Sequence, residues 1–343
     1  MAPALVDTDE TKEGLVLLTG GSGFIASHVL QQLLVEGHRV IFTARSKPKA
    51  SAVLAHLPPS LHPLVSSHIV EDISSPTAFD TLLQSHPFTH VIHTASPYQL
   101  TFANPITDCL DPAIKGTTSL LRSIATHCFT VRRVVITSSS AAILSPPNHL
   151  PVYNETCWSD VTLEQAMDPA HTYRASKKFA EKAAWDFVAS EKPNFDLATI
   201  NNTYTFGPIG PSPGELNTSN QRILNAVTGK WKDGVEPTAP VFTFVDVRDV
   251  AVAHVRAMTL PEAGGKRFYV VGEYFSNPKI AGIIRENFPE LRDRLPEETA
   301  DDFPEGHWKF DNARSREVLG LGYKGLEESV VDTVRSILER LKK

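Results

Sequence analysis

Apolar runs alternate with stretches of helical periodicity through the N-terminal part of this chain. An apolar run at residues 15–19 ends in a glycine-rich turn, and a helical pattern follows to about Glu36. Gly37 ends that helix, and residues 38–45 have the apolar pattern of a second strand. A strand, a glycine turn, a helix and a strand within about 30 residues predict a βαβ unit.

Further apolar runs predict four more strands, at residues 66–72, 90–96, 132–139 and 195–201. Helical stretches lie between most of them, notably at about 105–128 and 170–191. Such alternation is typical of a parallel sheet that is covered by helices on both faces. We therefore predict an α/β fold with a Rossmann-type doubly wound parallel sheet.

The pattern changes after about residue 205, where FGPIGPSPGE is rich in Pro and Gly and predicts a loop. The elements expected beyond it are strands at 241–247 and 266–272 and helices near 217–229, 248–259, 277–288 and 326–341. The domains expected are a flexible tail at 1–13, a Rossmann domain at 14–203 with about 241–260, and a smaller substrate-binding domain at 204–240 and 261–343. Some segments of this last part are expected to return to the main sheet.

Composition and charge exclude several classes of protein. The 343 residues suggest about two domains, and contents of 41% apolar and 21% charged residues are ordinary for a globular protein. The formal charge is −6, from 33 Lys and Arg against 39 Asp and Glu, and no basic cluster stands out. We therefore expect neither nucleic acid nor a membrane as a partner.

The N-terminal sequence and the cysteines indicate in which cellular compartment the protein is expected. No apolar run reaches the roughly 18 residues that span a bilayer, and the polar N-terminus does not resemble a signal peptide. Cys109, Cys128 and Cys157 form neither a CxxC motif nor a Cys/His cluster. We expect no disulfide framework, no metal and a reducing, cytoplasmic location.

The glycine turn has the spacing of a dinucleotide site. Gly20, Gly23 and Ala26 occupy the G-x-x-G-x-x-[G/A] positions between a strand and a helix. The first glycine allows a tight turn, the second allows a pyrophosphate to approach the backbone, and the small third residue allows close helix packing. Ser22, Phe24 and Ile25 are the neighbouring residues expected to contact the phosphates at the helix N-terminus.

The end of the second predicted strand indicates which dinucleotide binds. No acidic residue lies between Val40 and Lys49, whereas Arg45 stands at the strand end with Lys47 and Lys49 beyond it. A carboxylate there would select the ribose 2′-OH of NAD, and an Arg accommodates a 2′-phosphate. We therefore predict NADPH as the cofactor, with Arg45 as main ligand and Lys49 as helper; the alternative is a solvated basic loop.

Three further groups of residues have a structural as well as a functional interpretation. Asp72 and Ile73 end the third predicted strand, near the expected adenine, where Asp72 either accepts from the adenine amino group or caps the next helix. His93 lies in an apolar strand and is expected to be a core histidine. Asp246, Arg248 and Asp249 are expected to form ion pairs and caps that hold the domains in register.

Tyr173 and Lys177 are the main candidates for chemistry. They stand four apart in a predicted helix, which places both side chains on one face, one turn apart. A nearby ammonium favours the phenolate, so the tyrosine exchanges its proton more easily than its free pKa of about 10 allows. Ser138 and Ser139 end an apolar strand at the sheet edge where ligands bind in such folds, although serines also form simple turns there.

Taken in order, the glycine turn, the basic second strand, the serines and Tyr173-x-x-x-Lys177 resemble the short-chain dehydrogenase/reductase superfamily of the extended type. The runs FIASH, HTASP, ASKKFAEKAAW, LNTS and VDVRDVA are similar to those of fungal NADPH-dependent carbonyl reductases related to yeast methylglyoxal reductase. That group is itself similar to plant dihydroflavonol reductases. The resemblance extends from about residue 14 to the C-terminus.

This resemblance implies roles for individual residues. Ser139 would polarise a substrate carbonyl, Tyr173 would donate the proton, and Lys177 would lower the tyrosine pKa and hold the nicotinamide ribose. Further cofactor contacts would come from Thr94, Ala95, Ser96, Thr205 and Ser219. Ser219 would approach the diphosphate; the alternatives are a helix N-cap or a serine on the helix surface. Pro97, Tyr98, Leu144 and Tyr204 would line a largely apolar substrate pocket.

The chain departs from the family pattern at two positions. Asn202 replaces the proline that usually precedes the stretch at the nicotinamide, and Lys115 stands where some relatives carry an Asn. The expected function is reduction of ketones or aldehydes to alcohols by a monomer or homodimer. The alternatives are a nucleotide-sugar epimerase or dehydratase, although no basic cluster follows Gly207, and a non-catalytic NADPH-binding protein.

Overall fold

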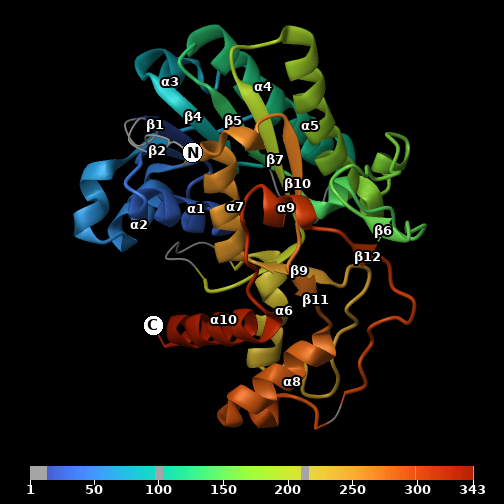
Figure 1. Cartoon of the computed structure of the whole chain (residues 1–343). Helices are drawn as coiled ribbons and strands as arrows, with labels where there is room; N and C mark the ends of the chain where they lie inside the picture. Colours follow the sequence, from blue (N-terminus) through green and yellow to red (C-terminus); the bar gives the residue numbers. More distant parts are fainter. Residues whose placement is uncertain (1–13, 97–102, 210–215, 298, 343) are drawn as a thin grey trace, which may run out of the picture.

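A seven-stranded parallel sheet forms the centre of the larger part of the molecule (Figure 1). The computed structural model describes residues 14–96, 103–209, 216–297 and 299–342. The strands run in the order β10-β7-β5-β4-β1-β2-β3. Their bounds are Leu15–Thr19 (β1), Arg39–Ala44 (β2), Val65–Ile69 (β3), Phe88–His93 (β4), Arg133–Thr137 (β5), Asp196–Asn202 (β7) and Lys266–Val270 (β10). The predicted fold class is confirmed.

Helices cover both faces of this sheet because successive strand residues point to opposite sides. Val16 and Leu18 pack on one side in a cluster that includes residues of the helices α1 (Phe24–Val35), α2 (Lys47–His56) and α7 (Val247–Thr259). Leu17 packs on the other side with α3 (Asp80–Ser85), α4 (Asp111–His127) and α5 (Pro169–Glu191). Burial on both faces explains the nearly continuous apolar strands.

A smaller unit lies below this sheet in Figure 1. Its three-stranded sheet has the order β11-β9-β8, with bounds Glu273–Tyr274, Thr243–Asp246 and Tyr204–Phe206. The helices α6 (Thr218–Val227), α8 (Asn277–Asn287) and α10 (Leu326–Leu341) enclose a core that includes Phe206, Trp231 and Phe275. The strands β6 (Val152–Tyr153) and β12 (Lys309–Phe310) pair in parallel, and α9 spans Ala313–Glu317.

Short helical turns complete the structure. Turns of 3-10 helix lie at Pro59–Leu64, Ser140–Ala142, Gln165–Met167, Pro261–Ala263 and Pro289–Arg294, and a π-helical turn at Ile106–Leu110 leads into α4. The turn at Ser140–Ala142 directly follows the end of β5. It packs against α5, the helix that carries Tyr173 and Lys177.

The structure shows which later segment returns to the main sheet and corrects the end of one strand. Within residues 261–343, β10 pairs in parallel with β7 and extends the main sheet, as expected for some segments of this part. The reason is that α7 covers the sheet and returns the chain to its edge, as in other crossover connections. The third strand also ends at Ile69 rather than near Asp72, because Val70 donates the last bond to the carbonyl of Ala44.

Candidate active site

The glycine turn between β1 and α1 brings backbone groups into close contact. Gly20 has φ +69°, and a Cβ there would lie 2.9 Å from the Cα of Ala95, so only glycine fits. Gly23 is the N-cap of α1, and a Cβ on it would meet only Gly20 O at 3.3 Å and the Ala26 methyl at 3.9 Å. No described side chain caps this helix, which suits the binding of a pyrophosphate to its first N–H groups. Ser22, Phe24 and Ile25 lie in this turn and the first residues of the helix.

Arg45 directly follows β2 beside this turn. The backbone N–H groups of Gly20 and Gly21 donate to Thr43, to its Oγ1 at 3.1 Å and its carbonyl at 2.8 Å, which fixes the turn against β2. Arg45 is exposed and has no hydrogen bond or ion pair with any residue that the structure describes. Lys49 is also exposed and lies in the first turn of α2, not in the basic loop considered as an alternative. This cation at the strand end suits a 2′-phosphate.

Asp72 lies in a turn after β3. Its Oδ1 accepts from the backbone N–H of Ser74 at 2.8 Å and from the Ser74 hydroxyl at 2.6 Å, and these bonds hold the Asp72 pKa below its usual value. The carboxylate is exposed and ionised, so it retains oxygens for an adenine amino group. Ile73 is half-buried against Gly116 of α4, where a glycine Cβ would lie 3.0 Å from its Cδ1.

Residues 94–96 connect the glycine turn with the catalytic candidates. The Thr94 hydroxyl donates to the carbonyl of Thr19, and Ala95 N donates to Thr19 Oγ1 at 3.1 Å. Ala95 and Ser96 also line a cavity of about 20 Å³, whose wall includes Lys177. That volume holds about one water molecule. The residues that follow β4 therefore contact the end of β1 on one side and share a cavity wall with Lys177 on the other.

His93 is a core histidine, as expected. It is 3% exposed, and its Nδ1 lies 2.8 Å from the hydroxyl of Thr19. Burial lowers its pKa to about 3, with a smaller contribution from the Lys177 charge. The ring is therefore neutral at physiological pH.

Tyr173 and Lys177 lie one turn apart near the start of α5, as their spacing predicts. Asp168 caps this helix by accepting from Ala170 N at 3.0 Å, and Pro169 occupies its first position. The Lys177 ammonium has no hydrogen bond with a residue in the described part of the chain. Burial lowers its pKa to about 8, while the nearby Cys109 and Glu181 raise it. At neutral pH the lysine is mostly a cation, available to a ligand hydroxyl.

Ser139 lies where β5 ends and is 9% exposed. Its Oγ accepts from Ala141 N at 3.1 Å and so caps the 3-10 turn at Ser140–Ala142. A hydroxyl that accepts through oxygen keeps its own proton for another acceptor. Ser139 therefore both forms the turn considered in the alternative interpretation and retains a donor for a carbonyl oxygen. The turn that Ser139 caps packs against α5.

Comparisons with known proteins show the family to which the chain belongs. The family model described as NAD dependent epimerase/dehydratase family matches residues 16–272. The chain belongs to this family. Ketoreductase azaE of Aspergillus niger is 52% identical over 330 residues, covering 95% of this chain and 98% of the relative.

Two further relatives tie the chain to reductases. The NADPH-dependent methylglyoxal reductase GRE2 of Saccharomyces cerevisiae is 34% identical, covering 94% of this chain and 98% of the relative. The crystal structure of Gre2 from Candida albicans in complex with NADPH superposes with a TM-score of 0.89 at 35% identity, covering 95% of this chain and 98% of that one. The resemblance noted from the sequence, to the extended family and to methylglyoxal reductases, is confirmed.

The resemblance to the family predicts a proline at the position of Asn202, and the structure shows which contacts the Asn202 amide makes. Asn202 is 8% exposed, and its Nδ2 donates to Thr205 Oγ1 at 2.9 Å and to Thr203 O at 3.4 Å. Its Oδ1 is buried with no hydrogen-bond partner in the described residues. Thr205 N in turn donates to Ser219 Oγ at 3.3 Å, so Asn202, Thr205 and Ser219 form one cluster. Ser219 is not the cap of α6, because Asn217 holds that position.

The predicted substrate pocket is only partly defined. Pro97 and Tyr98 lie outside the described residues. Leu144 is 2% exposed and packs with Tyr153 and Trp308, and its place in the substrate pocket stays a prediction. The half-buried Tyr204 accepts from Arg222 Nη2 at 3.1 Å, and the guanidinium lies 4.8 Å from its ring.

Lys115 lies away from this chemistry. It is exposed on α4 and pairs with Asp111 at 2.7 Å.

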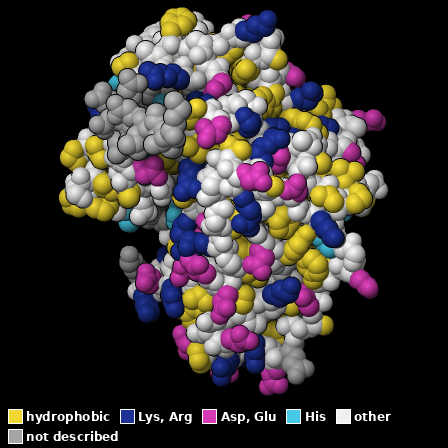
Figure 2. Space-filling model, in the orientation of Figure 1, with side chains coloured by type: hydrophobic (Ala, Val, Ile, Leu, Met, Phe, Trp, Pro, Cys, Tyr) yellow, Lys and Arg dark blue, Asp and Glu magenta, His cyan; other side chains and the backbone are white. Residues whose placement is uncertain are grey.

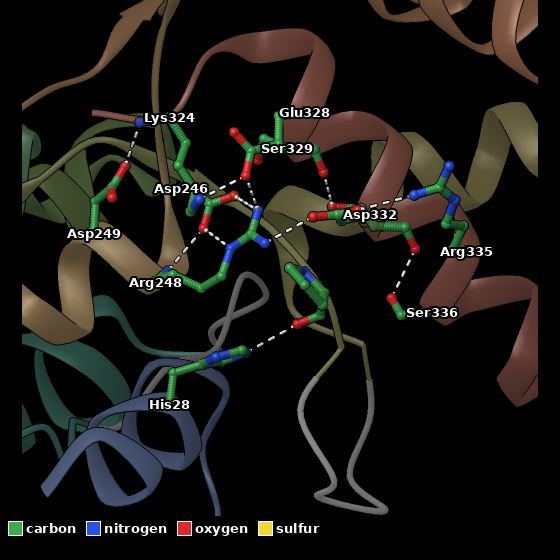
Figure 3. A network of polar contacts seen from close by, with 12 residues as sticks. His28, Asp246, Arg248, Asp249, Lys324, Glu328, Ser329, Asp332, Arg335 and Ser336 are labelled. Carbon is green, nitrogen blue, oxygen red and sulfur yellow. Dashed lines mark hydrogen bonds and ion pairs between the residues drawn. The ribbon is translucent and has the colours of Figure 1, made fainter. Parts of the chain in front are cut away.

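A polar network joins the two parts of the molecule (Figure 3). Asp246 caps α7 by accepting from Arg248 N at 2.8 Å, and the Arg248 side chain pairs with Asp246 and with Asp332 of α10. Asp249 accepts from Lys324 N at 2.8 Å, and burial raises its pKa to about 6. The expected caps and ion pairs of residues 246–249 are confirmed. His28 of α1 adds a further link by donating to Pro208 O at 2.9 Å.

Sequence reasoning missed the polar centre beneath the catalytic candidates. Glu181 is 2% exposed on α5, and Arg267 of β10 donates to it from Nε at 2.6 Å. The sequence does show a glutamate one turn after Lys177 on the same helix face. A charged residue at that position is, however, equally typical of a solvent-exposed helix surface. Its partners come from strands far away in the sequence, so no local pattern predicts them.

Proposed function

We propose that this chain is an NADPH-dependent carbonyl reductase that converts ketones or aldehydes to alcohols, with Tyr173 as the proton donor. Its relatives azaE and GRE2 carry the names of a ketoreductase and an NADPH-dependent reductase. NADPH, when bound, supplies the hydride. The protein binds the cofactor, orients the carbonyl and provides the proton.

The residues present fit that cofactor at three places. The glycine turn and the helix N-terminus suit the pyrophosphate, and Arg45 suits the 2′-phosphate. The Lys177 ammonium suits ribose hydroxyls. Thr94, Ala95 and Ser96 line the edge between these groups.

The proton step follows from the three catalytic candidates. Ser139 donates a hydrogen bond to the carbonyl oxygen and polarises the carbonyl. Tyr173 gives its phenolic proton to the same oxygen as that oxygen becomes an alkoxide, and the Lys177 cation stabilises the resulting phenolate. The observation that carries this proposal is the Lys177 ammonium: it lacks a protein hydrogen bond in the described region, one turn after Tyr173 on a helix packed against the turn that Ser139 caps.

An absorbance assay tests this proposal. The loss of NADPH is followed in the presence of each of a panel of ketones and aldehydes, for wild type and for Tyr173→Phe. We expect wild type to oxidise NADPH and form the alcohol, and Tyr173→Phe to lose about 100-fold or more in kcat while it still binds NADPH. NADPH binding without turnover of any carbonyl would contradict the reductase assignment and favour a binding protein. Turnover of a sugar nucleotide instead would favour the epimerase alternative.

The proposed function also implies a class of substrate. A small-molecule carbonyl compound is the substrate, and a monomer or homodimer stays a prediction, as does a cytoplasmic location. Among the described helices, none is both long and apolar enough to cross a membrane. Lys, Arg, Asp and Glu are interspersed over the face in Figure 2, without a single-sign basic patch on that face.

A further inference from the structure

Glu181 is a buried carboxylate directly beneath the proposed catalytic groups. It lies on α5 one turn beyond Lys177, and its side chain is 1% exposed. Side chains of five residues donate to its two oxygens, and Arg267 does so a second time from Nη2 to Oε2 at 3.5 Å. Oε1 accepts from Arg267 Nε at 2.6 Å, Thr199 Oγ1 at 3.0 Å and Trp185 Nε1 at 3.4 Å, and Oε2 accepts from Asn201 Nδ2 at 2.6 Å and from the Ser138 hydroxyl.

Two of these donors hold the strand end that carries Ser139. Ser138 is the residue before it, and its hydroxyl donates to Glu181. Asn201, on the neighbouring strand β7, donates from Nδ2 both to Glu181 and to the carbonyl of Ser139 at 3.3 Å. Glu181 therefore connects α5 with the backbone on both sides of the Ser139 side chain.

Arg267 compensates the buried charge. It is 9% exposed, it stacks on Trp158 at 3.7 Å, and it donates to the carbonyls of Glu155 at 2.6 Å and Cys157 at 2.7 Å. Desolvation makes a buried ion pair a weak source of stability, since apolar residues of similar volume often serve as well. We therefore look for its contribution in positioning rather than in stability. Only an anionic carboxylate can accept hydrogen bonds from all five residues at once.

We propose that Glu181 is a positioning residue that fixes Ser139 relative to Tyr173 and Lys177. This inference rests on the proposed function for its catalytic consequence. Tyr173, Lys177 and Glu181 are spaced by four residues along α5, so one rigid helix face carries the proton donor, its cation and the anchor. Ser138, Lys177 and Glu181 also line the same small cavity, which places the anchor next to the reacting groups.

The test compares the neutralised Glu181–Arg267 pair, which joins α5 to β10, with a second neutralised ion pair of the main sheet. Glu181→Gln alone leaves Arg267 buried and unpaired and is expected to be poorly stable, so the test variant is Glu181→Gln with Arg267→Gln. The matched control is Arg133→Gln with Asp196→Asn, because that pair joins β5 and β7 at their opposite ends, with Arg133 Nε at 2.6 Å from Asp196. The readouts are the Ser139–Tyr173 oxygen separation in crystals, kcat, the KM for the carbonyl and the Kd for NADPH.

We expect the Glu181/Arg267 variant to displace the Ser139 hydroxyl by about 0.5 Å or more and to lose roughly tenfold or more in kcat, with the Kd for NADPH within about twofold. The control is expected to lose thermal stability but to retain the oxygen separation and kcat. Retention of kcat and of Ser139 geometry in the test variant would overturn the inference, as would equal loss of kcat in both. An inactive wild type would instead refute the proposed function, and the oxygen separation alone would then decide the role of Glu181.

A milder variant covers the case in which the double variant does not fold. Ser138→Ala removes one hydroxyl from Oε2 at the catalytic strand end, whereas Thr199→Val removes one from Oε1 in the middle of β7. Both leave the Arg267 pair intact. We expect a several-fold loss of kcat only for Ser138→Ala, and equal kcat values in the two variants would overturn the inference.

Discussion

The Arg248 side chain turns back onto Asp246, two residues earlier, and pairs with it through Nε at 2.8 Å and Nη2 at 2.9 Å. The Asp246 carboxylate is fully buried, whereas Arg248 reaches outward to Asp332 at 2.7 Å. Arg248→Met would leave Asp246 as a buried charge without its cation. We expect a loss of about 3 kcal/mol in the free energy of unfolding, because uncompensated buried charges are costly. Chemical denaturation measures this loss.

Arg335 provides the control for that prediction. It pairs with the same Asp332 at 3.4 Å, but its side chain is 66% exposed. Exposed pairs contribute little, so Arg335→Ala is expected to change stability by less than about 1 kcal/mol. Equal losses in the two variants would mean that the buried Asp246 does not depend on Arg248.

Arg45→Ala tests the choice of cofactor. Arg45 stands where a 2′-phosphate would lie, and hydrogen bonds to charged groups are worth about 1.5–3 kcal/mol, so the Kd for NADPH should rise roughly 10- to 100-fold. The Kd for NADH should change little. Arg39→Ala is the matched control, because Arg39 is an exposed arginine at the opposite end of β2. Cofactor fluorescence gives both constants, and equal weakening of NADPH and NADH would remove Arg45 from the 2′-phosphate.

The pKa of Lys177 predicts how cofactor binding depends on pH. Burial lowers that pKa from 10.5 to about 8, so the cation is present below pH 8 and is lost as the pH rises through this value. Its neighbours Cys109 and Glu181 oppose the shift, and the nearby His93 stays neutral. We expect the Kd for NADPH in wild type to increase above about pH 8, and Lys177→Arg to bind with little change there because arginine stays charged. The same pH dependence in both proteins would assign the titration to another group.

Much of the fold follows from the sequence because it depends on local periodicity. Apolar runs predict six strands of the main sheet between residues 15 and 202, and the glycine spacing predicts the turn at Gly20. The helix α2 is not predicted by the sequence pattern. It buries only Ala50 and Val53, so its sequence lacks a clear apolar stripe. The place of β10 in the main sheet depends on the return path after α7, which no local pattern records.

The candidate site shows the same division. Tyr173, Lys177 and Ser139 follow from motif and spacing, and α5 packs against the turn at Ser140–Ala142 as their proposed cooperation requires. Glu181 does not follow, because its carboxylate is satisfied by side chains from β5, β7 and β10 that meet only in the folded sheet. The pocket role of Leu144 stays a prediction, since a buried apolar residue is expected both in a core and behind an apolar pocket.

The most direct test of the account is a crystal structure with NADPH and a bound ketone. We expect the carbonyl oxygen to lie within about 3 Å of both Ser139 Oγ and Tyr173 Oη, with the carbonyl carbon facing the nicotinamide and Lys177 at the ribose. A carbonyl oxygen bound away from Tyr173, or a nicotinamide that lies outside the edge formed by β4, β5 and β7, would contradict it.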